Sequence, residues 1–227
     1  MSYAILNKVQ DYSSSPAEFT LRGLLGAALS ADWRQAMIAR GFGYHVDVGA
    51  FSTPIQGGGA GTILDLDQPE FGISVATGYT IVPIRVDIAV QVPISAADSD
   101  ENEILLAVDR AAAWAGDGTV TTETAVNMRT NATGNPSGVT IFSAATADIT
   151  DPVLGHELAH RVKIVDYVGT PANALMSDLQ LLYEPLNPPF LVGPCCLYGY
   201  WGGTVANTGF ANIDFIAFAS SLITGLS

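Results

Sequence analysis

The chain has 227 residues, of which 48% are hydrophobic and 14% charged, so it can bury a substantial core and is not an intrinsically disordered polypeptide. Its 22 acidic and nine basic residues give a net charge of −13. This balance argues against a function in binding nucleic acid, because each phosphate contact needs a Lys or Arg. We expect no sequence-specific nucleic-acid binding. We also expect no membrane span, because the apolar run from Phe215 to Leu226 is shorter than the ~20 residues that a spanning helix needs.

Residues 1–41 are predicted to form an N-terminal arm with short helices. Apolar residues recur there at helical spacing: Leu21, Leu24, Leu25, Ala28 and Leu29. The pattern starts again at Trp33, and Gly41 stands where a helix would end. The arm has two interpretations, a helix that packs on the core or a segment that reaches a neighbouring subunit.

Residues 42–227 are predicted to form one β-sandwich domain. Short runs of alternating hydrophobicity, separated by Gly, Pro and Asn, indicate strands. These runs are 44–48, 71–75, 79–92, 104–114, 119–130, 139–144, 158–168, 175–183, 190–201 and 213–218. Pro83 and Pro93 suggest that the long run is an edge strand or carries a bulge. No alternation of strands with helices is visible, so the predicted fold class is all-β, an antiparallel sandwich.

The sharpest local motif is His156-Glu157-Leu158-Ala159-His160, which matches H-E-x-x-H. On a helix, two histidines in this pattern bind zinc and the glutamate activates a water molecule. A zinc metallopeptidase with His156 and His160 as ligands and Glu157 as general base is therefore an alternative function.

Other features of the sequence favour a strand at this motif. The only other histidine, His45, is far upstream, and the only downstream glutamate, Glu184, precedes a proline. Residues 162–168 are mostly β-branched or aromatic, which suits a strand. On a regular strand the two histidines would share one face about 13 Å apart, too far to hold one ion. We therefore predict no metal ligand, no cofactor and no catalytic residue.

Two further patterns have structural explanations as well as functional ones. Residues 98–103, Asp-Ser-Asp-Glu-Asn-Glu, begin like a calcium loop but lack its glycine and closing glutamate. We expect a solvated acidic turn there, and the sequence leaves open whether it binds calcium. The adjacent Cys195 and Cys196 cannot form a disulfide framework, and we expect one of them to face the core.

The last fifty residues carry a resemblance to a known class of protein. An apolar strand ends in the proline-rich corner Glu184–Pro189, a Gly/aromatic strand follows at Leu197–Thr204, and Thr208–Phe218 is a final alternating strand. This order resembles the closing strands of jelly-roll virion proteins, particularly those of bacteriophages and marine viruses. The likeness covers about the last third of the chain and implies a single jelly-roll-like sandwich.

The resemblance implies a structural virion protein, a capsid subunit or a capsid-stabilising decoration protein, and no enzyme. Such a protein would form a homo-oligomer, a trimer or larger, would contact other virion proteins through apolar surfaces, and would be assembled in the host cytoplasm. Because jelly rolls also occur in lectins, a second alternative is a carbohydrate-binding sandwich of a receptor-binding structure. In that case Tyr198, Tyr200 and Trp201 would form the stacking surface.

Overall fold

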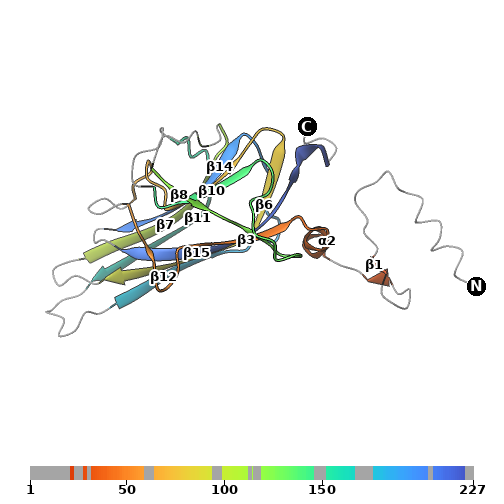
Figure 1. The fold of residues 1–227 in the computed structure, drawn as a ribbon. Helices are drawn as coiled ribbons and strands as arrows, with labels where there is room; N and C mark the ends of the chain where they lie inside the picture. The colour runs from red at the N-terminus through yellow and green to blue at the C-terminus, as the bar shows by residue number, and fades with distance from the viewer. Residues whose placement is uncertain are drawn as a thin grey trace, which may run out of the picture.

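The computed structural model describes residues 21–22, 28–29, 32–58, 64–93, 99–111, 114, 119–145, 152–166, 176–203 and 207–222. The chain is mostly β, with two antiparallel sheets in a sandwich-like arrangement, as predicted (Figure 1). One sheet has the order β11-β7-β14-β5-β10-β8, with bounds β11 His156–Asp166, β7 Ser99–Asp109, β14 Cys195–Gly203, β5 Phe71–Val75, β10 Val139–Ser143 and β8 Thr121–Glu123. We call it the first sheet.

The second sheet has the order β12-β6-β15-β3-β9, with bounds β12 Met176–Tyr183, β6 Tyr79–Pro93, β15 Thr208–Ala219, β3 Gly43–Val48 and β9 Val126–Asn127. Two short strands are added to it, β13 (Leu191–Val192) on β6 and β4 (Ile55–Gln56) on β15. The strands β1 (Leu21–Arg22) and β2 (Ala28–Leu29) pair with each other. The short 3₁₀ helix η2 (Ser220–Leu222) follows β15.

Eight of the nine described strands that have five or more residues pair in a nested order, and the ninth, β10, pairs with β5 and β8. The first, β3, pairs with the last, β15; β5 pairs with β14; β6 pairs with β12; and β7 pairs with β11. Every one of these pairs is antiparallel. Among the described residues, each of these eight strands therefore pairs with the strand that holds the same place counted from the other end of the series.

The core lies between the two sheets and follows from the alternation of side chains along each strand. On β7, Ile104, Leu106 and Val108 face inward, and on β12 Leu179 and Leu181 do so. The residues between them face outward, and on the first sheet they form a second apolar cluster around Tyr198 and Tyr200, covered by Leu64, Trp114, Val120 and Leu154. Loops therefore cover the outer face of the first sheet.

Strand β6 contains a bulge that explains its unusual proline. Arg85 pairs with Asp214 and Pro83 with Phe215, so Ile84 is an extra residue without a direct partner. The bulge turns Ile84 and Val82 to the outer face of the second sheet, where they pack with Phe218. Pro83 thus marks a bulge in a strand that lies inside the sheet, between β12 and β15.

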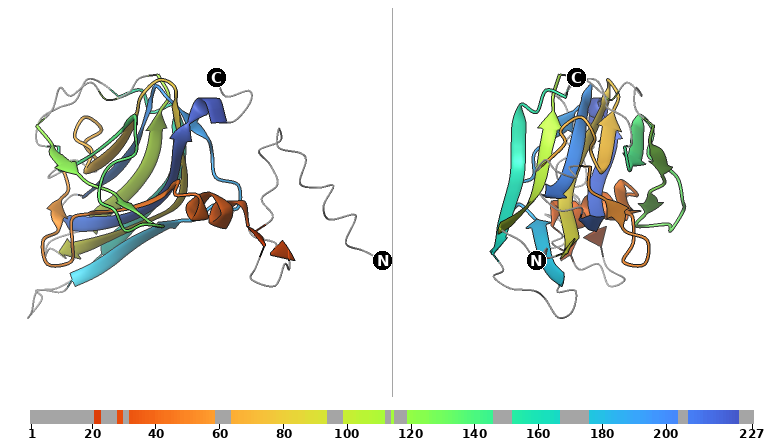
Figure 2. Two further views of the ribbon diagram at one scale, coloured as in Figure 1. Left: turned by 45° about the vertical axis from the view of Figure 1, so that its right-hand side comes forward. Right: turned by 90° about the vertical axis from the view of Figure 1, so that its left-hand side faces the viewer.

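Helix α2 (Trp33–Ala39) lies at the start of β3 (Figure 2), and its residues Met37 and Ile38 pack against this outer apolar patch. Asp32 caps its start, and Gly41, with φ of +88°, follows its end. The N–H of Phe42 donates to the carbonyl of Met37, and the N–H of Gly41 donates to that of Ile38. This is a Schellman motif, and both Phe42 and Met37 pack against the outer apolar patch. It turns the chain directly into β3.

Several sequence predictions need correction. The helical spacing over Leu21–Leu29 does not give a helix where the structure describes it, because 21–22 pairs with 28–29 as strands. The run 119–130 forms only the short strands β8 and β9. The predicted acidic turn at 98–103 is strand from Ser99 onward, and Asp98 lies outside the described residues. The runs at 71–75, 79–92, 139–144 and 175–183 are confirmed within a residue or two.

Candidate functional site

The H-E-x-x-H motif lies on a strand. Residues 156–166 form β11, paired throughout with β7. A register shift between Glu157 and Ala159 leaves Leu158 as an extra residue, which packs against the core. His156 pairs with Val108, an inward residue, whereas His160 pairs with Leu105, an outward one. Because paired residues share a face, the two histidines lie on opposite faces of the sheet. Our expectation that they share one face was wrong, and the bulge is the reason.

Each histidine of the motif has its own partner. His156 Nδ1 lies 2.9 Å from Arg110 Nη2. His160 lies on the outer face with Nε2 3.5 Å from Glu103 Oε2 and Nδ1 3.9 Å from Glu157 Oε1. Among the described residues, no group of three His, Cys, Asp or Glu side chains is placed to hold a metal ion. Further along β11, the ammonium of Lys163 donates to the carbonyl oxygen of Asp178 on β12, at 2.6 Å.

The aromatic residues that the carbohydrate-binding alternative needs are buried. Tyr198, Tyr200 and Trp201 expose 3%, 1% and 1% of their surfaces. Tyr198 and Tyr200 lie under the loops that cover the first sheet, and Trp201 faces the core between the sheets. These three rings therefore form no exposed surface on which a sugar could stack.

The two adjacent cysteines are free and buried on opposite sides of β14. Cys195 faces the core, as expected of one of the pair, and Cys196 belongs to the outer aromatic cluster. Burial raises the pKa of Cys195 to about 11 and that of Cys196 further still. Because the thiolate is the reactive form, neither thiol is activated in the folded chain.

The acidic run before β7 has strand geometry in its described part. Glu101 and Glu103 pair with Ile164 and Val162 of β11, whereas Asn102 points to the other side and is buried. A calcium loop needs successive ligands that curl around one ion. Residues 99–103 are extended, and Glu101, Asn102 and Glu103 alternate between the two faces of the sheet.

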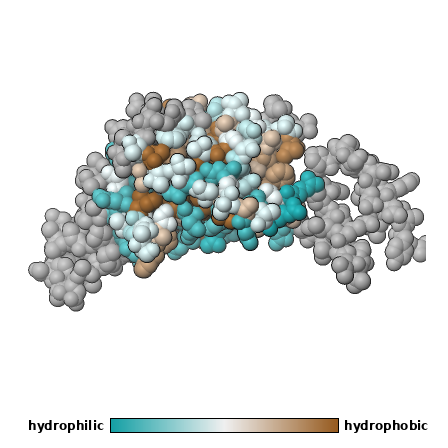
Figure 3. Space-filling model, viewed as in Figure 1, coloured by the Kyte–Doolittle hydropathy of each residue, from teal (hydrophilic) through white to brown (hydrophobic). Residues whose placement is uncertain are grey.

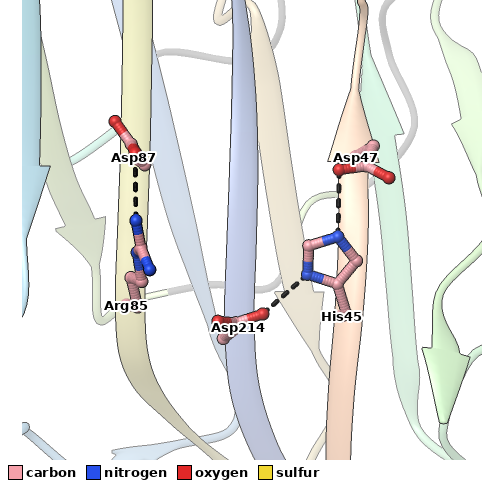
Figure 4. A network of polar contacts seen from close by, with 5 residues as sticks. All are labelled: His45, Asp47, Arg85, Asp87 and Asp214. Carbon is pink, nitrogen blue, oxygen red and sulfur yellow. Dashed lines mark hydrogen bonds and ion pairs between the residues drawn. The ribbon is translucent and has the colours of Figure 1, made fainter. Parts of the chain in front are cut away.

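A polar network that the sequence did not reveal lies on the outer face of the second sheet (Figure 4). His45 of β3 lies between two aspartates: Nδ1 is 2.6 Å from Asp214 Oδ1 on β15, and Nε2 is 3.0 Å from Asp47 Oδ1. One strand further, Arg85 of β6 forms an ion pair with Asp87 at 3.2 Å. The alternation of His45 and Asp47 within the run 44–48 places them on one strand face. Only the pairing of β3 with β15 adds Asp214.

Glu70 is the second residue that the sequence did not reveal. It is 3% exposed and precedes β5. Its carboxyl accepts hydrogen bonds from the backbone N–H groups of Gly58, at 2.5 Å, and Trp201, at 2.8 Å. Burial raises the pKa of Glu70 to about 8, against the opposing effect of the two N–H donors. Its position shows that it ties the loop at residues 57–58 to β14.

A groove of about 360 Å³ opens at the end of the sandwich near α2. It is lined by Phe42, Tyr44, Tyr79, Pro136, Ser137, Ala217, Phe218, Ala219 and Leu222. Leu222 of η2, which lines the groove, is exposed, as are Phe190, whose ring packs on Phe218 of the groove wall, and Trp33 on α2. Figure 3 shows a brown area at this end of the molecule.

Comparison of the chain with protein-family models, curated proteins and solved structures gives no match. None of the described helices is both long and apolar enough to cross a membrane. The class of protein that the described residues define is thus an antiparallel two-sheet β-sandwich with one short helix packed on it.

Proposed function

We propose that this chain is a structural virion protein with a jelly-roll fold, either a capsid subunit or a protein that stabilises or decorates the capsid. The nested strand pairing carries the proposal. The first of the eight nested strands pairs with the last, the second with the seventh, the third with the sixth and the fourth with the fifth. A jelly roll has eight strands in two sheets wound in this way, and viral capsids are among its principal uses.

The surface supports assembly into a larger structure. Leu222, which lines the groove, exposes 49% of its surface, Phe190, which packs on Phe218 of the groove wall, exposes 41%, and Trp33 on α2 exposes 41%. Soluble monomers rarely expose large apolar patches, which more often mark contacts between subunits. We therefore expect a homo-oligomer, a trimer or larger, that buries this end of the sandwich.

The charge supports a place away from the genome. A net charge of −13 repels the phosphate backbone and suits a shell or an outer layer. Because a fold alone does not fix a function, the proposal depends on the behaviour of the purified protein. The same charge would steer the subunit toward basic surfaces of other virion proteins.

The test is the state of association of the full-length chain, measured by sedimentation and seen by negative-stain microscopy. We expect trimers or larger closed particles, and we expect Leu222→Asn to weaken association. Phe51→Asn is the matched control, because Phe51 is 75% exposed but follows the opposite end of β3. A chain that stays monomeric at high concentration, or that loses association equally in both variants, would contradict the proposal.

A further inference from the structure

Both ring nitrogens of His45 face a carboxylate oxygen. Nδ1 lies 2.6 Å from Asp214 and Nε2 lies 3.0 Å from Asp47. A neutral imidazole has one donor and one acceptor, and an ionised carboxylate can only accept. Both contacts are therefore hydrogen bonds only when the ring carries two protons and a positive charge. The positions of the two carboxylate oxygens thus fit a positively charged imidazolium ring.

The protonated ring of His45 joins two strands that are distant in sequence. His45 and Asp47 belong to β3, and Asp214 belongs to β15, the strand that pairs with β3 along residues 43–48. On its other side, only Tyr44 and His45 of β3 pair with the short strand β9, where Asn127 and Val126 are their partners. The hold of β3 on the sheet therefore depends mainly on β15, and the contact between His45 and Asp214 lies in the middle of that pairing.

Strand β3 also fixes the helix that precedes it. The Schellman turn at Gly41 joins α2 directly to Gly43, two residues before His45. The N–H of Ala217 on β15 donates to the carbonyl of Phe42, and Phe42 packs in the outer patch beneath α2. Loosening the start of β3 would therefore also loosen α2.

We propose that His45 is a pH-dependent link between β3 and β15. When His45 is protonated, it holds β3, and with it α2, to β15. When His45 is neutral, this end of the sheet opens more often. On loss of one proton, one ring nitrogen presents a lone pair to a carboxylate oxygen in place of an N–H. One hydrogen bond is then lost, and the two aspartates face each other across an uncharged ring.

The charges around the ring are consistent with this assignment. Partial burial lowers the pKa of His45, but the hydrogen bonds and charges of Asp214 and Asp47 outweigh it, so the pKa lies above its ordinary value of 6.5. The next charged groups on the same face are Arg85 and Asp87 of β6, which pair with each other. From β9, the residues beside His45 are Val126 and Asn127, which carry no charge.

The experiment is hydrogen–deuterium exchange of the full chain at pH 6 and pH 8.5, corrected for the intrinsic pH dependence of exchange, together with an NMR titration of the histidine rings. We expect amides of β3 and α2 to open about three to ten times more often at the higher pH. The change at β3 and α2 should exceed the change at amides of β7 in the other sheet, which report the pH dependence that arises from groups other than His45. The His45 ring should titrate above 6.5.

Variants distinguish a pH-dependent role of His45 from a merely structural role of its side chain. In His45→Gln, the excess of the pH effect at β3 and α2 over that at β7 should disappear, and Asp214→Asn should lower the pKa of His45. His160→Gln is the matched control, because His160 is also partly exposed and near two glutamates, but on the other sheet. A His45 pKa at or below the ordinary value, or an unchanged pH effect in His45→Gln, would overturn the proposal.

Discussion

The carboxyl of Glu70 accepts a hydrogen bond from the backbone N–H of Trp201, 131 positions further along the chain, at 2.8 Å. The same carboxyl accepts from the N–H of Gly58. These bonds satisfy backbone groups that burial would otherwise leave without a partner. One buried acid thus joins a loop, the start of β5 and the middle of β14.

This arrangement predicts a pH dependence of stability. The pKa of Glu70 is about 8 in the folded chain and 4.5 ordinarily. Between these values the folded state keeps a proton that the unfolded state has lost, so the free energy of unfolding falls as the pH rises. The slope from this group is at most about 1.4 kcal/mol per pH unit, and it ends above pH 8. Urea unfolding of Glu70→Gln between pH 5 and pH 8 should show a shallower fall than the wild type.

A second carboxyl variant provides the control for this measurement. The side chain of Glu157 is 59% exposed, so Glu157→Gln should leave the pH profile of stability unchanged. If Glu70→Gln and Glu157→Gln gave the same profile as the wild type, burial of Glu70 would not be the source of the slope.

Close packing of an aromatic ring over a glycine predicts that a larger residue at the glycine position lowers the stability of the chain. A Cβ added to Gly199 on β14 would overlap the ring of Phe71 on the paired strand β5, and both residues are in the core. Gly199→Ala should therefore destabilise the chain by roughly 1–3 kcal/mol. At Gly155 the nearest atom to an added Cβ is 3.9 Å away, so Gly155→Ala should change stability by less than about 0.5 kcal/mol. Equal midpoints of thermal unfolding for the two variants would argue against this packing.

The cysteines should be inert in the folded chain. Cys195 and Cys196 expose 1% and 0% of their surfaces, and burial raises both pKa values. A thiol reagent such as DTNB should label neither residue at pH 8 without denaturant, and both residues in denaturant. Rapid labelling of either cysteine in the native protein would show that β14 is accessible from outside.

The placement of the histidine motif predicts the outcome of a zinc-binding measurement. Because His156 and His160 lie on opposite faces of β11, the double variant His156→Ala/His160→Ala should retain as much zinc after dialysis as the wild type. Elemental analysis by mass spectrometry would measure this. One equivalent of zinc in the wild type that disappears in the double variant would revive the metallopeptidase alternative.

Strands were the predictable part of this chain because alternation is a local signal. The run 79–92 became β6, and the run 71–75 became β5 without change. The helix predicted from the spacing of Leu21 to Leu29 was wrong, because a periodic pattern does not show whether a segment has a surface on which to pack. Trp33–Ala39 became a helix with Asp32 and Gly41 at its two ends, where local capping chemistry agrees with a tertiary contact.

The functional groups were less predictable because they depend on pairing. Asp214 is 169 positions from His45, and nothing in either segment shows that they meet. The bulge at Leu158 is also a product of the pairing between β11 and β7. The face of each histidine in the motif therefore could not be obtained by counting along a regular strand.

Strand β11 forms one border of the first sheet, and such borders invite recruitment of further strands into cross-β fibrils. Arg161 and Lys163 are paired with Ile104 and Asn102 and so alternate with Val162 and Ile164 along that border. Suppose that β11 of a second copy of the chain pairs antiparallel with this β11, with the two Val162 residues opposite each other. Arg161 of each copy would then lie opposite Lys163 of the other, so that two cations face each other. The strand thus carries its own protection against amyloid-like growth, which matters most at high protein concentration.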